Sequence, residues 1–182
     1  MNQERVLRGS SGDTEGPPAY DGEAVKVLAS RAQLRSIELT EVTFQDLDSQ
    51  EPFDTRVLGR DIEPEVGLFI EWQLDTERSR LSCLVTASYS LQLPTHAAED
   101  QDEASEAEQP VDEPEEAWLQ AVYRVVYEVA EVGSPITKEQ GQQFAHWNVP
   151  FNVWPYFREL TSNVLQRTRH TPLLVPLFRM PR

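Results

Sequence analysis

The alternation of apolar and polar residues predicts a β-sheet in the first two thirds of the chain. Between residues 68 and 75, and again between 81 and 92, apolar side chains recur at every second position, as in strands with one buried face. The polar turn at 76–78 joins the two strands and predicts a hairpin. Residues 118–130 alternate as well, with valines on both faces, which favours a central or covered strand.

The earliest predicted strand, residues 33–44, has an irregular pattern. In a regular strand Ile37 and Leu39 would lie on one face, and Val42 and Phe44 on the other. A β-bulge, which inserts one extra residue, is one explanation for the change of face. Upstream, residues 23–30 suit either a short helix or an extended arm. The connection at 45–65 is long and holds at most one short element.

The spacing of residues after 134 predicts a short helix and then a long one. Thr137 and Gln140 form a capping-box pattern, so we expect the short helix to run from there to about Trp147. The long helix is expected over 152–167. Asn152 would be its cap, and Pro155 would lie in the first turn, where the missing N–H of proline removes no intrahelical bond.

The predicted long helix is apolar over a wide arc. Val153, Phe157, Leu160 and Val164 fall on one helical face, and neighbouring apolar residues widen it. One sheet covers one side of such a helix, so the pattern favours a second subunit on the other side. The fold class is therefore α+β: a four-stranded antiparallel sheet followed by a short and a long C-terminal helix, in one domain over 23–182.

Two segments are expected to lie outside the core. Residues 1–22 are rich in glycine, serine and proline and are predicted to be a disordered N-terminal tail. Residues 95–116 are strongly acidic and are predicted to be a solvated, disordered loop. The alternative hypothesis is that the negative charge of this loop attracts a basic segment of a partner.

Charge and cysteine usage narrow the function classes. A formal net charge of −15 opposes binding to nucleic acid, whose phosphates require an excess of Lys and Arg, and docking on anionic membranes. There is no apolar run of about 20 residues for membrane insertion, and the first residues lack a secretory signal pattern. With Cys83 as its single cysteine, the chain has no disulfide framework. We expect a cytoplasmic protein.

No residue pattern indicates catalysis. His96, His146 and His170 have no partners at metal-ligand spacing, so no metal is predicted. The position of Cys83 on the apolar row of a strand favours a core residue over a nucleophile. There is no glycine-rich phosphate loop, and no cofactor is predicted. The protein is therefore expected not to be an enzyme.

Several segments resemble the SecB family of protein-export chaperones. Residues 154–159, Trp-Pro-Tyr-Phe-Arg-Glu, are similar to the Phe-Pro-Tyr-Ala-Arg-Glu segment of that family. Residues 139–146 look like the segment that precedes its long helix, and 173–178 are similar to its Leu-Asn-Leu-Ala-Pro-Val-Asn-Phe tail. Residues 32–44 have the rhythm of its first strand. The similarity is good over 136–178 and fair over 31–44.

The resemblance implies an ATP-independent holdase that keeps preproteins unfolded for translocation. It also implies a homotetramer, a dimer of dimers with the long helices packed between the dimers. In the family, a second helix and often a zinc-binding tail that contacts the motor SecA follow, whereas this chain has Met180-Pro-Arg182. That difference keeps open a solitary SecB-like chaperone that protects an antitoxin. A structural adaptor without client binding is a third reading.

Aromatic residues gather where the two predicted helices meet. They suit either core packing with an oligomer interface or a groove for extended apolar segments of unfolded chains, since hydrophobic burial does not depend on side-chain order. The candidate client-binding residues are Phe44, Phe53, Trp72, Phe144, Trp147 and Phe151. The candidate oligomer-interface residues are Trp154, Phe157, Leu160, Thr161, Val164 and Leu165.

Overall fold

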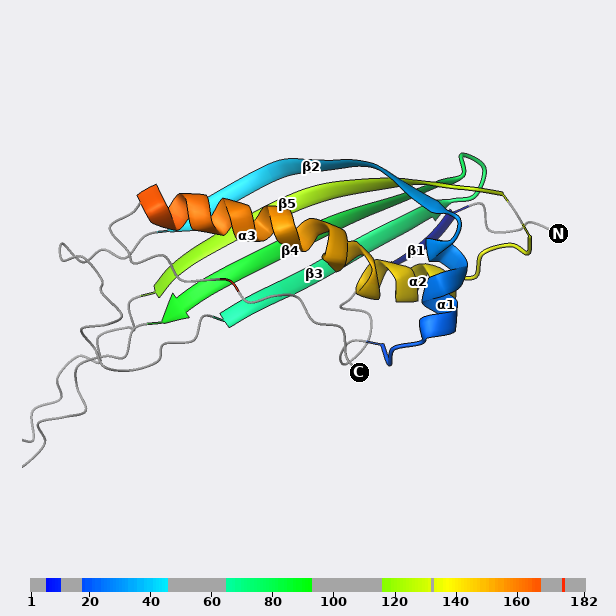
Figure 1. The fold of residues 1–182 in the computed structure, drawn as a ribbon, viewed down its shortest axis with the longest axis horizontal. Coiled ribbons are helices and arrows are strands. Elements are labelled where there is room, and N and C mark those ends of the chain that lie inside the picture. The colour runs from blue at the N-terminus through cyan, green and yellow to red at the C-terminus, as the bar shows by residue number, and fades with distance from the viewer. Residues whose placement is uncertain are drawn as a thin grey trace, which may run out of the picture.

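A computed structural model describes residues 6–10, 18–45, 65–92, 116–131, 133–167 and 175. In this part of the chain, one antiparallel sheet carries three helices on one face (Figure 1). The elements are β1 Val6–Ser10, α1 Gly22–Ala29, β2 Ala32–Gln45, β3 Glu65–Asp75, β4 Arg80–Gln92, β5 Glu116–Val129, α2 Lys138–Trp147 and α3 Val149–Arg167.

The sheet has five strands in the order β1-β3-β4-β5-β2, so the predicted number of four is wrong. The additional strand, β1, lies within the segment expected to be a disordered tail. It pairs with β3, with Leu7 opposite Leu74. Two apolar residues among five are too few to predict a strand, because the pairing is made by the main chain. Residues 1–5 and 11–17 of the predicted tail, and 95–115 of the predicted loop, lie outside the described residues.

The predicted hairpin is confirmed as β3 and β4. Trp72 pairs with Cys83, which places the apolar rows of both strands on the face that the helices cover. In the turn, a side-chain oxygen of Asp75 accepts hydrogen bonds from the backbone N–H groups of Glu77 and Arg78, at 3.1 and 3.0 Å. This turn fixes the register, and a slip by one residue would turn the apolar rows to water.

The irregular pattern of β2 is explained by two register shifts against β5. They fall between Leu34 and Ser36 and between Leu39 and Glu41. The second shift confirms the bulge that the sequence suggested at this position. Because each shift inserts one residue, the apolar side chains of β2 all face the helix side of the sheet. These are Leu34, Ile37, Leu39, Val42 and Phe44.

The short helix is confirmed as predicted, with both hydrogen bonds of the capping box. Gln140 N–H donates to the Thr137 hydroxyl at 3.2 Å, and Thr137 N–H donates to the Gln140 side chain at 3.0 Å. Upstream, residues 22–29 form the helix α1. Of the two alternatives for residues 23–30, a short helix or an extended arm, the helix is therefore correct. Asp21 caps α1 through its side chain.

The long helix starts earlier than predicted. α3 begins at Val149, so Asn152 is not its cap and Pro155 lies in the helix interior. Pro150 takes the place in the first turn that was assigned to Pro155. Inside the helix, the side-chain N–H of Asn152 donates to the Tyr127 hydroxyl at 3.0 Å, which ties α3 to β5.

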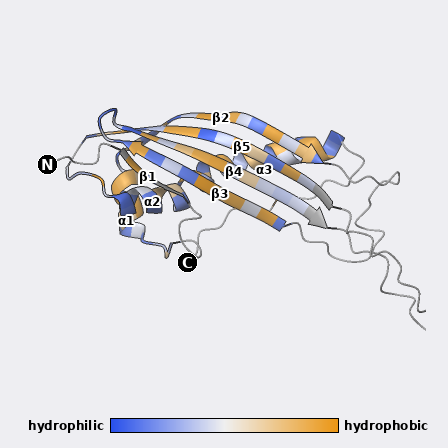
Figure 2. Ribbon diagram, turned by 180° about the vertical axis from the view of Figure 1, so that it is seen from behind, coloured by the Kyte–Doolittle hydropathy of each residue, from blue (hydrophilic) through white to orange (hydrophobic). Residues whose placement is uncertain are grey.

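The core lies between the sheet and the three helices. Leu81, Val85 and Val125 of the sheet and Val153 and Phe157 of α3 are fully buried there. No described element covers the opposite face of the sheet. Figure 2 is viewed from this side, with the sheet in front of the helices. Phe69 and Leu84 are exposed on that face. Among the described helices, none is long and apolar enough to cross a membrane.

Candidate binding groove

The edge strand β2 carries apolar side chains that the helices leave exposed. The exposed fractions are 40% for Leu34, 47% for Leu39 and 42% for Val42, although all three face the helix side of the sheet. α3 packs against β4 and β5. The edge strand β2 therefore lies beyond the part of the sheet that α3 covers, and its apolar side chains are exposed to solvent.

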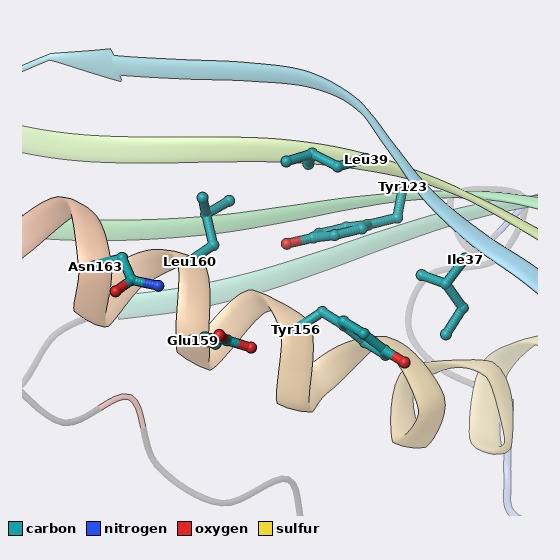
Figure 3. Close-up of a pocket in the computed structure, with 7 residues that line it drawn as sticks. All are labelled: Ile37, Leu39, Tyr123, Tyr156, Glu159, Leu160 and Asn163. Atoms are coloured by element: carbon teal, nitrogen blue, oxygen red, sulfur yellow. The ribbon is translucent and has the colours of Figure 1, made fainter.

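A groove of about 250 Å³ lies between β2 and α3. Ile37 and Leu39 of β2 form one wall, Tyr123 of β5 lies between the walls, and residues of α3 form the other wall (Figure 3). The α3 wall combines apolar and polar side chains: Tyr156, Glu159, Leu160 and Asn163. Such a surface can bury apolar side chains of a ligand while its polar rim contacts the ligand's main chain.

Tyr123 supplies a neutral phenol to this groove. The residue is only 3% exposed, and its hydroxyl has no hydrogen-bond partner among the described residues. Burial raises the pKa of Tyr123 to about 12, because desolvation disfavours the phenolate. At neutral pH the ring therefore acts as an apolar surface with a hydroxyl group and not as a charged group.

The structure separates the predicted client-binding residues into two groups. Trp72 and Phe144 are core residues, 4% and 1% exposed, which suits the core-packing alternative. Trp147 and Phe44 are half-buried, and Phe151 is 50% exposed at the start of α3. Phe53 lies outside the described residues. None of the five described candidates lines the groove between β2 and α3.

Most of the predicted interface residues pack inside the single chain. Phe157 and Thr161 are fully buried, and Trp154 and Leu165 are 7% and 5% exposed. Leu160 and Val164 are half-buried, and Leu160 lines the groove. The sheet of the same chain thus covers much of the apolar arc that had suggested a second subunit.

Sequence reasoning missed most of the groove. Apart from Leu160, its lining residues were not singled out as candidates. The clue in the sequence was the alternating apolar pair Ile37 and Leu39, followed by the change of face in the same strand. The exposure of that pair depends on where α3 crosses the sheet, which no local pattern encodes.

The rest of the described chain offers little chemistry for catalysis. It holds no group of three or more His, Cys, Asp or Glu side chains that could bind a metal. Cys83 is buried, and desolvation raises the pKa of its thiol well above the usual range, which disfavours the nucleophilic thiolate. Partial burial lowers the pKa of His146, because desolvation disfavours the charged imidazolium.

Comparisons with known proteins add a structural relative. No family model matches the chain, and no curated protein matches it in sequence. A solved structure of the Mycobacterium tuberculosis SecB-like chaperone Rv1957, in complex with a ChAD peptide from the antitoxin HigA1 (Rv1956), matches with a TM-score of 0.61. The match covers 88% of this chain and 99% of that chain.

The fold is SecB-like. The predicted fold class, an antiparallel sheet followed by C-terminal helices, is confirmed apart from the number of strands. At 16% identity the likeness concerns the fold alone. In the SecB-like fold seen here, the groove lies between the edge strand and the long helix.

Proposed function

We propose that this protein is an ATP-independent chaperone, a holdase, that binds unfolded polypeptide segments in the groove between β2 and α3. The observation that carries the proposal is the exposed apolar wall on an edge strand. Leu39 is 47% exposed, and among the described strands β2 has a neighbour, β5, on one side only. An extended segment can place its apolar side chains in the groove and pair its main chain with the strand edge.

The charge of the chain supports the same proposal. A net charge of −15 keeps a protein with exposed apolar residues soluble and attracts basic segments of unfolded clients. Glu159 brings negative charge to the groove itself. Neither hydrophobic burial nor charge attraction requires a defined client sequence. Such a surface can therefore bind many unrelated unfolded chains, as a holdase does.

Two classes of client fit this surface. The first is preproteins held unfolded in the cytoplasm for export, in line with the similarity of residues 154–159 to the SecB export chaperones. The second is an antitoxin, and it is favoured by the relative of known structure, which binds an antitoxin peptide. Contact with SecA stays a prediction. A gene for a toxin–antitoxin pair beside the gene of this protein would favour the second class.

We further propose that copies of the chain assemble as a homotetramer, a dimer of dimers. The residues predicted for the interface are largely buried in the single chain, so exposed residues must supply the contact. Phe151, which is 50% exposed, and Pro155, also exposed, lie on the first two turns of α3 and are candidates. Sedimentation velocity at micromolar concentration tests this: a monomer contradicts the proposed assembly.

Aggregation assays test the chaperone proposal. An aggregation-prone protein is diluted from denaturant with and without this protein, in the absence of ATP, and light scattering is followed. We expect suppression at a near-stoichiometric ratio. Unchanged scattering over a range of unrelated clients would contradict the proposal and favour a structural adaptor. We expect no turnover of any client, since a holdase only binds.

A further inference from the structure

A short extended segment, residues 19–21, lies across the surface of α2 and is held there through its main chain. The Gln143 side-chain N–H donates to the carbonyl oxygen of Ala19 at 2.7 Å. The Gln143 side-chain oxygen accepts from the backbone N–H of Asp21 at 3.0 Å. The Gln143 amide thus forms hydrogen bonds with both main-chain groups that flank Tyr20, as a neighbouring strand would.

An aromatic contact completes this arrangement. The ring of Tyr20 meets the ring of Trp147 edge to face, with 5.6 Å between the ring centroids and 84° between the planes. Aromatic pairs of this geometry are stabilising beyond their buried area. Trp147 is also one of the residues that the sequence suggested for client binding, and it lies at the end of α2.

The segment is exposed, whereas the side chain that binds it is buried. Tyr20 is 45% exposed, and Ala19 and Asp21 are also exposed, whereas Gln143 is only 6% exposed. Removing the segment would uncover the Gln143 amide with its two hydrogen-bonding groups unpaired. The Trp147 indole N–H is also buried and has no hydrogen-bond partner among the described residues. Unpaired polar groups of this kind favour an incoming donor and acceptor.

We propose that Gln143 and Trp147 form a second polypeptide-binding site on α2, which residues 19–21 occupy in cis. The ligand in trans is an extended segment of an unfolded chain with one aromatic residue. The main-chain groups around Tyr20 are common to every extended polypeptide, so the site selects for the aromatic ring and not for its neighbours. This inference rests on the proposed holdase function and adds an aromatic preference to it.

Exchange of the segment does not require the domain to unfold. α1, which follows the segment, is anchored in the core by Leu28 and Val25, which are 0% and 6% exposed. Residues 19–21 can therefore leave α2 while α1 stays in place, at the cost of the N-cap that Asp21 provides to α1. The cis segment lowers the fraction of molecules with a free site, and the apparent affinity for a client falls in proportion. A variant that loosens the cis segment should then bind clients more tightly.

Fluorescence anisotropy with labelled extended peptides tests this inference. One peptide carries a single tyrosine, and the other has serine at that position. We expect Tyr20→Ala to bind the tyrosine peptide at least about threefold more tightly than the wild type, with little change for the serine peptide. Adding Trp147→Ala to Tyr20→Ala should abolish the gain. Arg124→Ala, exposed on the opposite face of the sheet, is the matched control and should behave as the wild type.

Hydrogen exchange at the Asp21 amide measures directly whether residues 19–21 leave the site. The tyrosine peptide should speed exchange of this amide in the wild type, because the amide loses the Gln143 oxygen as acceptor. If Tyr20→Ala binds the tyrosine peptide no more tightly than the wild type, the inference is overturned, whatever the aggregation assay gives. If the wild type fails to suppress aggregation, the proposed holdase function falls separately. Circular dichroism of each variant shows whether it is folded.

Discussion

Leu39 of β2 and Tyr123 of β5 are paired across the sheet, yet Leu39 is 47% exposed and Tyr123 only 3%. The difference arises because α3 packs on β5 but leaves the edge strand uncovered. Both residues line the groove, so its surface changes from buried to exposed within one strand spacing. A chain that binds here gains apolar contact on its inner side and a strand edge on its outer side.

A charge in this groove should weaken client binding. Leu39→Glu places a carboxylate where apolar client side chains would be buried, and burying an unpaired charge is costly. We expect at least about a tenfold loss of affinity for an unfolded client, which corresponds to about 1.4 kcal/mol. Leu84→Glu is the matched control: Leu84 is 37% exposed on the opposite face of the sheet. Equal losses in both variants, measured by light scattering, would place client binding elsewhere.

The packing of α2 on the sheet depends on a glycine. A Cβ atom at Gly141 would lie 2.7 and 2.8 Å from two ring atoms of Trp72, which is closer than packed side chains allow. We expect Gly141→Ala to lower the free energy of unfolding by about 1–3 kcal/mol, measured in urea. In a Trp72→Phe background the smaller ring leaves room, so the same substitution should cost less. Additive losses would show that the two residues are not in contact.

Two tyrosines of β5 should respond oppositely to removal of the hydroxyl group. The buried Tyr123 hydroxyl has no partner among the described residues, so Tyr123→Phe should leave the free energy of unfolding unchanged or raise it by about 1 kcal/mol. Tyr127 accepts a hydrogen bond from Asn152, so Tyr127→Phe should lower the free energy by about 1 kcal/mol. Urea denaturation of both variants measures the difference, and a larger loss in Tyr123→Phe would contradict it.

The protein should lose stability in alkaline solution. Burial raises the pKa of Tyr89 and Tyr123 to about 12 and raises the pKa values of Cys83 and Tyr127 further. The unfolded thiol and phenols release their protons first, from about pH 8.5 and pH 10, so the unfolded state binds fewer protons above those values. The free energy of unfolding therefore falls as the pH rises, by up to about 1.4 kcal/mol per pH unit and group.

Cys83 is the first of these groups to contribute, because the unfolded thiol has the lowest pKa. In Cys83→Ala the decline in stability should therefore begin nearer pH 10 than pH 8.5. Denaturation in urea at a series of pH values compares the two slopes. A free energy of unfolding that stays constant from pH 8 to pH 11 would show that these groups are not buried in the folded protein.

Local patterns predicted most of the sheet and the short helix. The alternation in β3, β4 and β5 gave the buried faces, and Thr137 with Gln140 marked the start of α2. The start of α3 was misplaced because Pro150 and Pro155 both suit a first turn, and only the fold decides between them. β1 was missed because its pairing with β3 is a long-range main-chain interaction and not a side-chain pattern.

The candidate site was harder to predict because it depends on where elements meet. Trp72 and Phe144 are aromatic, and aromatic residues suit both cores and binding grooves. Phe144 packs edge to face on Tyr127 of β5, at 5.2 Å between ring centroids, which the sequence does not encode. Likewise, the sequence shows that α3 is apolar over a wide arc. It does not show how much of that arc the chain's own sheet covers.

The most direct test of client binding is hydrogen exchange of the wild-type protein with and without an unfolded client, at one fixed protein concentration. If an extended segment binds between β2 and α3 and pairs with the strand edge, backbone amides of residues 33–44 should exchange more slowly when the client is present. Unchanged exchange throughout β2, with the client bound as judged by light scattering, would contradict the assignment of the groove as the client-binding site.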